Sequence, residues 1–224
     1  MSKYNLLKYN KIFILAREML IGEYAMRHKT YRMEGKETMS DLLDYEINKE
    51  LGECYLFMGE YEKAAEYYEK AAASGSEFSA PQMGLATIAV QLGDYDSAFL
   101  HYQKALELEK TDNAYTGLGL VAMTKEMHAD AFEYFKNALE IKTTNTVALG
   151  CLVQEAYALD KVDEAVSYVE KFYGETKDPQ IRITLAGCLI YLGKKDEARS
   201  HLEEALKELP DNQDAKDLYS FIAA

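Results

Sequence analysis

A repeat of 33 or 34 residues is the feature that most constrains how this chain can fold. The stretch GEYEKAAEYYEKAA at 59–72 returns as GDYDSAFLHYQKAL at 93–106 and EMHADAFEYFKNAL at 126–139. Weaker copies are DKVDEAVSYVEKFY at 160–173 and GKKDEARSHLEEAL at 193–206. The aligned alanines, spaced by 34, 33, 34 and 33 residues, are Ala64, Ala98, Ala131, Ala165 and Ala198. A fixed period of this length is typical of a solenoid, in which each unit packs on its neighbours.

Each period contains two helical patterns. In the first period, DYEINKELGECYLFMG and EYEKAAEYYEKAAASG both end in glycine, a frequent helix stop. Within the second of them, Ala64, Tyr68 and Ala71 recur at the spacing of one helix face. The unit is therefore predicted to be a helix, a tight turn and a second helix. Small residues at equivalent places in the two helices would let the axes approach closely, namely Gly52 with Ala64, Gly119 with Ala131 and Ala186 with Ala198.

These residues resemble the motif of the tetratricopeptide repeat (TPR) family over about residues 45–210. The matching positions of the best repeats are Leu51, Gly52, Tyr55, Ala64, Tyr68 and Ala71, then Leu118, Gly119, Ala131, Phe135 and Ala138, and finally Leu185, Ala186, Ala198, Leu202, Ala205 and Pro210. The resemblance implies an all-α, right-handed superhelical solenoid of helix-turn-helix repeats. It implies five repeats, at about 45–78, 79–111, 112–145, 146–178 and 179–211.

The two ends and the fourth repeat depart from this pattern. Residues 1–40 are expected to form an N-terminal helical hairpin, with a degenerate sixth repeat left open, and residues 212–224 a capping helix. In the fourth repeat Val153, Val169 and Phe172 replace the expected small or aromatic residues. Its second helix is predicted to end at Gly174, before a turn at 174–179. Looser packing or a bend is one interpretation, and a repacked repeat with no special role is the favoured one.

No motif indicates chemistry. GLGLVA at 117–122 fits GxGxxA, but a dinucleotide loop needs a preceding strand, and these glycines fall inside a predicted helix. There is no GxSxG, HExxH or P-loop pattern, and the four histidines and three cysteines lack ligand spacing. We expect a protein that is not an enzyme, with no catalytic, cofactor-binding or metal-binding residues and no cofactor.

The net charge of −13 makes nucleic acid an unlikely partner. Residues 1–40 carry eight Lys or Arg against four Asp or Glu, a balance of +4 against −17 for the rest. The apolar run KIFILA at 11–16 is too short to span a membrane, so no signal peptide and no transmembrane segment are expected. The unpaired cysteine pattern favours a cytoplasmic location.

The TPR resemblance implies that first helices line a concave groove in which peptides or partner helices lie. Mapped onto this chain, the candidate groove residues are Met83, Thr87, Val90, Gln91, Asn113, Thr116, Leu120, Met123, Gln154, Tyr157, Ile183, Ile190 and Tyr191. Seven further inward positions in the same repeats are Ala80, Thr124, Val147, Gly150, Ala158, Gln180 and Gly187. None of the twenty is charged, although 28% of the chain is. The first repeat instead places Glu46, Lys49, Glu53, Leu56 and Phe57 there.

Such a lining favours an apolar peptide or an amphipathic helix as the partner. A carboxylate clamp is not predicted, because Glu53 stands where the family's clamp has Asn. The main hypothesis is thus a non-enzymatic protein-protein interaction module, an adaptor or scaffold. One alternative is a self-assembling TPR scaffold, a homo-oligomer that uses the N-terminal hairpin, as in magnetosome-associated or secretion-related TPR proteins. A weaker alternative is a peptide-sensing regulator with a DNA-binding N-terminus.

Overall fold

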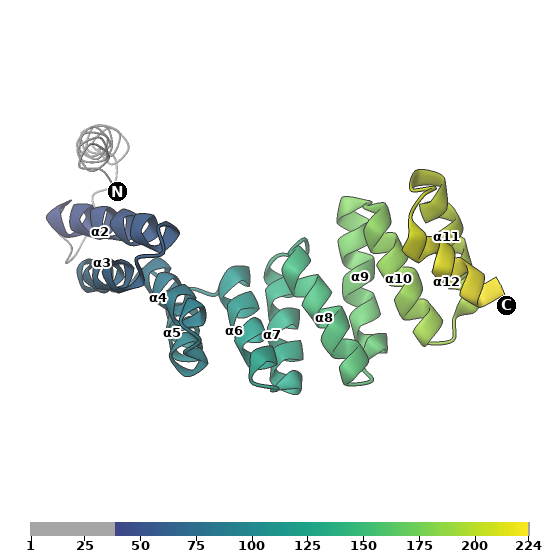
Figure 1. Ribbon diagram of the computed structural model, residues 1–224, viewed down its shortest axis with the longest axis horizontal. Helices are drawn as coiled ribbons and strands as arrows, with labels where there is room; N and C mark the ends of the chain where they lie inside the picture. Colours follow the sequence, from purple (N-terminus) through teal and green to yellow (C-terminus); the bar gives the residue numbers. More distant parts are fainter. Residues whose placement is uncertain (1–38, 224) are drawn as a thin grey trace. The chain divides into compact units, whose positions relative to one another are not determined.

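The computed structural model describes residues 39–223, which form eleven helices and no strand (Figure 1). The N-terminal hairpin expected over residues 1–40 lies almost wholly outside this range. The chain divides into two compact units at Glu77 and Phe78, and each is described by itself. In the first unit, α2 (Met39–Phe57) packs against α3 (Tyr61–Ser74).

The second unit holds the other nine described helices, in four helix pairs and a final helix. Their bounds are α4 (Ala80–Gln91), α5 (Tyr95–Leu108), α6 (Asp112–Thr124), α7 (His128–Ile141), α8 (Thr146–Ala158), α9 (Val162–Thr176), α10 (Pro179–Tyr191), α11 (Lys195–Glu208) and α12 (Gln213–Ala223). Each helix packs on the next in chain order, and α6 also touches α8. The predicted all-α solenoid of helix pairs is confirmed.

The turn inside each pair contains one residue with left-handed backbone. Glycine fills this place in three pairs, at Gly59, Gly93 and Gly193, with φ of 73°, 76° and 76°. Glycine adopts such angles without steric cost, which explains the glycine after the first helix of these three pairs. In the other two pairs the same place holds Glu126 and Asp160, with φ of 57° and 56°.

Glycines inside the first helices make room for rings of the second helices. A Cβ atom on Gly52 would lie 2.8 Å from the ring of Tyr68. On Gly119 it would lie 2.4 Å from the ring of Phe135, which is itself fully buried. The close approach predicted from the small residues is therefore an approach of backbone to aromatic ring.

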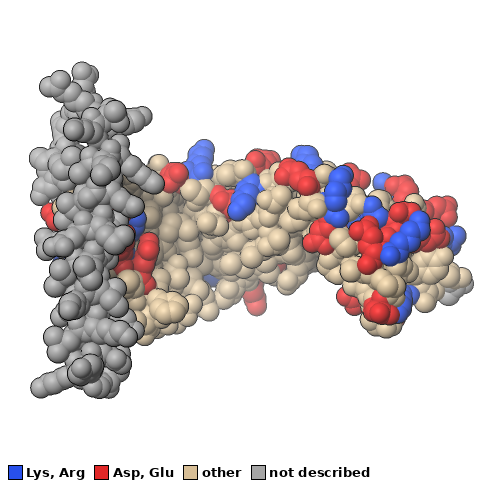
Figure 2. Space-filling view, turned by 90° about the horizontal axis from the view of Figure 1, so that it is seen from above, with Lys and Arg blue, Asp and Glu red and all other residues tan. Residues whose placement is uncertain are grey.

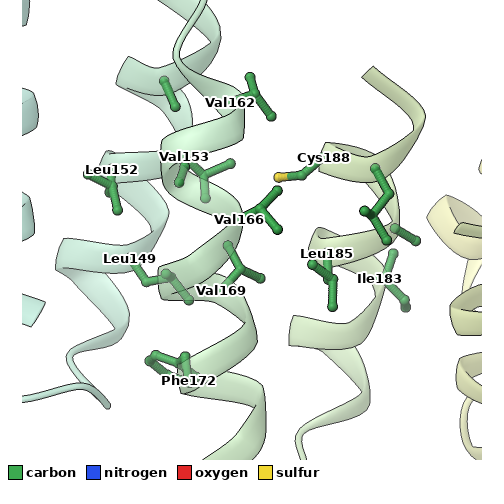
Figure 3. Close-up of a cluster of buried hydrophobic side chains, with 14 of the residues drawn as sticks. Leu149, Leu152, Val153, Val162, Val166, Val169, Phe172, Ile183, Leu185 and Cys188 are labelled. Carbon is green, nitrogen blue, oxygen red and sulfur yellow. The ribbon is translucent and has the colours of Figure 1, made fainter. Parts of the chain in front are cut away.

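The fourth repeat is densely packed. Val153 on α8 and Val169 and Phe172 on α9 are all buried, together with Leu185 and Cys188 on α10 (Figure 3). Val153 and Phe172 thus add bulk where other repeats have small residues, while Val169 is smaller than the rings found at its position in the first three repeats, and this supports a repacked repeat over a loose one.

The prediction that the fourth repeat's second helix ends at Gly174 is wrong. Helix α9 continues through Gly174 to Thr176. Lys177 then adopts φ of 55°, and Pro179 begins α10. Gly174 meets no atom within 4 Å at its Cβ position, so it is an exposed helical residue. The left-handed backbone of Lys177 ends α9, as is common at helix C-termini, and Pro179 begins the next helix two residues later.

One buried carboxylate joins the third and fourth repeats. Glu155 on α8 is 2% exposed, and its Oε2 lies 2.8 Å from Nδ1 of His128, the first residue of α7. The equivalent places in the neighbouring repeats are apolar, with Val121 and Cys188 matching Glu155 and with Tyr95 and Val162 matching His128. The pair is thus a polar link at positions where the adjacent repeats have apolar residues.

Candidate functional site

The predicted groove residues lie on α4, α6, α8 and α10, the first helices of the second unit. Of the twenty inward positions, eighteen retain solvent exposure and two, Thr116 and Ile183, are buried. We refer to the eighteen accessible residues as the first-helix surface. It contains no charged side chain.

Thr116 is buried because it belongs to a joint between repeats. Its Oγ1 donates to the carbonyl oxygen of Asp112 at 2.7 Å and accepts from Nδ2 of Asn145 at 3.1 Å. Asn145 is also the N-cap of α8, with Oδ1 accepting from the backbone N–H of Ala148 at 2.9 Å. Thr116 therefore links two first helices and is not available to a ligand. Ile183 likewise packs in the core with Leu185 and Leu189.

Large apolar side chains on the first-helix surface remain open to solvent. Leu120 on α6 is 41% exposed, Val147 and Tyr157 on α8 are 50% and 38% exposed, and Tyr191 on α10 is 50% exposed. Figure 2 shows a face of the molecule with a broad uncharged area, beside charged side chains that gather toward the right-hand end, where α11 and α12 lie. Exposed apolar side chains that gather on successive helices are typical of protein interaction sites.

Two tyrosines form a fixed aromatic pair on this surface. The rings of Tyr157 and Tyr191 are 5.1 Å apart between centroids and nearly perpendicular, at 82°. The hydroxyl of Tyr191 donates to Oδ1 of Asp160 at 2.9 Å, and that of Tyr157 lies 3.8 Å from Sγ of Cys188. Burial, reinforced by Cys188, raises the pKa of Tyr157, so its hydroxyl stays protonated. The ring contact and the hydroxyl interactions hold both side chains in defined orientations.

Side-chain amides lie among the apolar groups. Gln91, Asn113 and Gln154 are exposed, and within residues 39–223 none of their side chains has a hydrogen-bond partner. A side-chain amide both donates and accepts, so these three can hydrogen-bond to the main chain of a bound segment.

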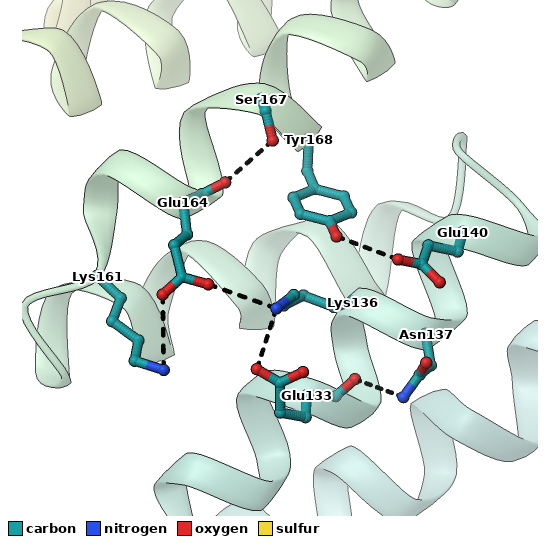
Figure 4. A network of polar contacts seen from close by, with 8 residues as sticks. All are labelled: Glu133, Lys136, Asn137, Glu140, Lys161, Glu164, Ser167 and Tyr168. Carbon is teal, nitrogen blue, oxygen red and sulfur yellow. Dashed lines mark hydrogen bonds and ion pairs between the residues drawn. The ribbon is translucent and has the colours of Figure 1, made fainter.

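Ion pairs connect the second helices of the same repeats. Lys136 on α7 pairs with Glu133 at 3.0 Å and reaches Glu164 on α9 at 3.4 Å, and Tyr168 on α9 bonds to Glu140 (Figure 4). Both helix faces are therefore solvated and ion-paired. The second helices thus carry paired charges on their outer faces, whereas the accessible inward positions of the first helices carry no charge.

The part of the chain that the structure describes offers no arrangement for bond chemistry. GLGLVA lies inside α6, where Gly117 and Gly119 accommodate the rings of Tyr102 and Phe135. No three His, Cys, Asp or Glu residues among residues 39–223 are grouped to hold a metal ion. Burial raises the pKa of the free thiols of Cys54, Cys151 and Cys188, which disfavours reactive thiolates.

The first unit differs, as the sequence suggested. Lys49 on α2 pairs with Glu46 at 2.6 Å, and Phe57 at the end of the helix is almost fully exposed. None of the helices that the structure describes is both long and apolar enough to cross a bilayer.

Solved structures of known proteins share the fold of this chain. Solved structures of similar fold include YrrB, described as a TPR protein with an unusual peptide-binding site, at 20% identity and a TM-score of 0.60, over 76% of this chain and 89% of YrrB. They also include MamA (18%, TM-score 0.59, 73% and 91%) and pilF of Pseudomonas aeruginosa (16%, TM-score 0.59, 80% and 90%). No curated protein matches the chain. At these identities the likeness concerns the fold.

Models of known protein families match most of the described residues. One model described as tetratricopeptide repeat matches residues 49–113 and 83–146, and a second with the same description matches residues 156–220. Together they span most of the described helices, in the register of the aligned alanines. TPR repeats mediate contacts between proteins, and the chain belongs to the tetratricopeptide repeat family.

Proposed function

We propose that this protein is a non-enzymatic adaptor or scaffold that binds an apolar peptide or an amphipathic helix along the first-helix surface. The observation that carries the proposal is the absence of charge from eighteen accessible positions on four successive first helices. Leu120, Met123, Tyr157 and Tyr191 supply the apolar contacts, while the exposed amides bond to the partner's main chain. The reduced cysteines suit a cytoplasmic protein.

The test uses the full chain as bait for a phage library of random peptides. We expect it to enrich peptides that contain an apolar run. The double substitution Leu120→Asp with Tyr157→Asp should abolish this enrichment, because each new carboxylate would be desolvated by an apolar ligand. Helix content by circular dichroism should stay unchanged, since both side chains are substantially exposed.

A matched control lies on α5. Leu108 and Tyr95 are 41% and 37% exposed, close to the 41% and 38% of Leu120 and Tyr157, but they belong to a second helix. The variant Leu108→Asp with Tyr95→Asp should keep the enrichment. If both double variants bind like the native chain, or if both lose binding, the first-helix surface is not the site.

Self-association is a second candidate, favoured by charge. Residues 1–40 carry +4 and the rest of the chain −17, so the N-terminal segment of one copy is electrostatically attracted to the body of another. Light scattering of the full chain and of a chain that begins near Ser40 should then give an oligomer and a monomer. A monomer in both cases would exclude this candidate.

A further inference from the structure

We propose that the partner segment carries Lys or Arg beside its apolar anchor, and that Glu126 and Asp160 recognise this positive charge. The inference rests on the proposed function, because it names the chemistry of the ligand that the first-helix surface takes. It concerns two residues that the TPR motif does not select, since their positions hold glycine in the other three repeats.

Both residues lie in the turns that follow first helices, next to the first-helix surface. Glu126 is the second residue after the end of α6, and its backbone N–H donates to the carbonyl oxygen of Met123, a member of that surface, at 2.9 Å. Asp160 follows α8, and its Oδ1 accepts the hydroxyl proton of Tyr191, another lining residue. The two occupy the same place in successive repeats, and Asp160 contacts the Tyr157–Tyr191 pair through the hydroxyl of Tyr191.

These two charges are not neutralised by the protein itself. The neighbouring lysines are already engaged, since Lys125 pairs with Asp96 and Lys161 pairs with Glu164. Among the described residues no Lys, Arg or His forms an ion pair with Glu126 or Asp160. The second unit, residues 78–224, has 14 Lys and Arg against 24 Asp and Glu, a net charge of −10, so a basic partner is attracted to the unit as a whole.

Glu126 and Asp160 have a backbone conformation that favours glycine. Both have left-handed φ, which disfavours residues with a Cβ, and the other repeats avoid that cost with Gly59, Gly93 and Gly193. Glutamate and aspartate at such places therefore carry a steric penalty that charge-free glycine would remove. A role in recognition explains why two adjacent repeats hold acids there.

An uncharged surface with carboxylates along one edge discriminates among partner segments by their charge as well as by the apolar area that they bury. The apolar anchor of the partner lies on Leu120 and the tyrosine pair, and a cation next to the anchor reaches Glu126 or Asp160. A segment with Glu or Asp in that place meets uncompensated negative charge, so acidic flanks are rejected. The occupant is thus an apolar segment with basic flanks.

The experiment repeats the phage selection with the full chain and with the double variant Glu126→Gln, Asp160→Asn. These substitutions keep side-chain size and the left-handed backbone cost, so they remove charge only. The control variant Glu107→Gln, Asp163→Asn removes two exposed carboxylates from the second helices α5 and α9. We expect native and control baits to enrich apolar peptides with Lys or Arg adjacent to the apolar run. The Glu126/Asp160 variant should enrich apolar peptides without that excess.

A peptide selected by the native chain should bind the Glu126/Asp160 variant about two- to thirtyfold more weakly at low salt, the range for two exposed ion pairs, and the difference should shrink at high salt. Apolar peptides without basic excess, or a basic excess that survives in this variant, would overturn the inference and leave the proposed function standing. Selection of no peptide at all would overturn both.

Discussion

At the residue scale, the residue in the left-handed position between paired helices affects the free energy of unfolding, and its identity differs among repeats. A Cβ atom at such an angle approaches the following carbonyl oxygen, and the cost is of the order of 1 kcal/mol. Two repeats bear that cost at Glu126 and Asp160, and three avoid it with glycine.

We therefore expect Glu126→Gly to raise the free energy of unfolding by about 0.5–1 kcal/mol, less the gain in unfolded-state entropy that glycine brings. Gly93→Ala should lower it by about 1 kcal/mol, because alanine loses the freedom that φ of 76° requires. Urea unfolding followed by circular dichroism measures both, with Glu107→Gly inside α5 as a control that should destabilise. Equal effects at 93 and 126 would contradict the steric explanation.

His201 on α11 gives the molecule a pH dependence. Burial lowers the pKa of its imidazole, and Arg182 lowers it further, while Glu170 and Glu197 oppose these effects. Because the folded-state pKa is below the unfolded value of about 6.5, the unfolded chain binds a proton first as the pH falls. Stability should thus be full above pH 6.5 and decrease below it.

The measurement is the urea midpoint between pH 7.5 and 5, compared with His201→Gln. The variant should show a shallower decrease over this interval, because glutamine does not titrate. Parallel curves would show that His201 does not contribute.

At the element scale, some helices pair through an aromatic ring of one helix that packs directly against a glycine of the other. Gly119 on α6 and Phe135 on α7 form one of the tightest such contacts, since a Cβ atom added to Gly119 would lie 2.4 Å from the ring. The ring is buried, so it cannot move into solvent.

We expect Gly119→Ala to destabilise the chain by about 1–3 kcal/mol through overpacking. Phe135→Leu alone should also destabilise, by leaving a cavity, but the two together should cost less than their sum, since the smaller side chain makes room for the methyl group. Thermal or urea unfolding of the four proteins forms a double-mutant cycle. Additive losses would mean that the two positions do not meet in solution.

Helix pairs and their turns could be predicted from the sequence because small residues and glycines recur with the period. The end of α9 could not, because Gly174 looks like a stop, although the left-handed residue is Lys177. Eighteen of the twenty predicted inward positions are accessible, and that they bind a partner stays a prediction; Thr116 and Ile183 are buried. Thr116 has the residue type of a lining position, and only its bonds to Asp112 and Asn145 show that it is occupied. The one sequence signal was Asn145, a good N-cap residue that starts the next helix.

At the scale of the whole molecule, the second unit is a linear stack in which contacts join neighbouring helices. Stability in such a stack is close to a sum of local terms, so a defect at one end should stay local. The helix α12 closes the carboxyl end by burying Ala215 and Ile222 against the last repeat.

Ile222→Ala should cost about 2–4 kcal/mol locally, because it removes a buried aliphatic side chain. Hydrogen exchange followed by mass spectrometry should show faster exchange in α10, α11 and α12 and little change in α4, α5 and α6. Uniform acceleration over all nine helices would indicate that the unit unfolds as one cooperative body.

The contact between Glu155 and His128 limits how such an array can change during evolution. Repeat proteins gain and lose units by duplication and deletion, which works when every junction is interchangeable. Deleting the third repeat here would bring Tyr95 opposite Glu155 and leave a buried carboxylate without its imidazole partner. Deleting the fourth would place Cys188 opposite His128. Loss of the third repeat alone should therefore cost the array more stability than loss of the third and fourth repeats together.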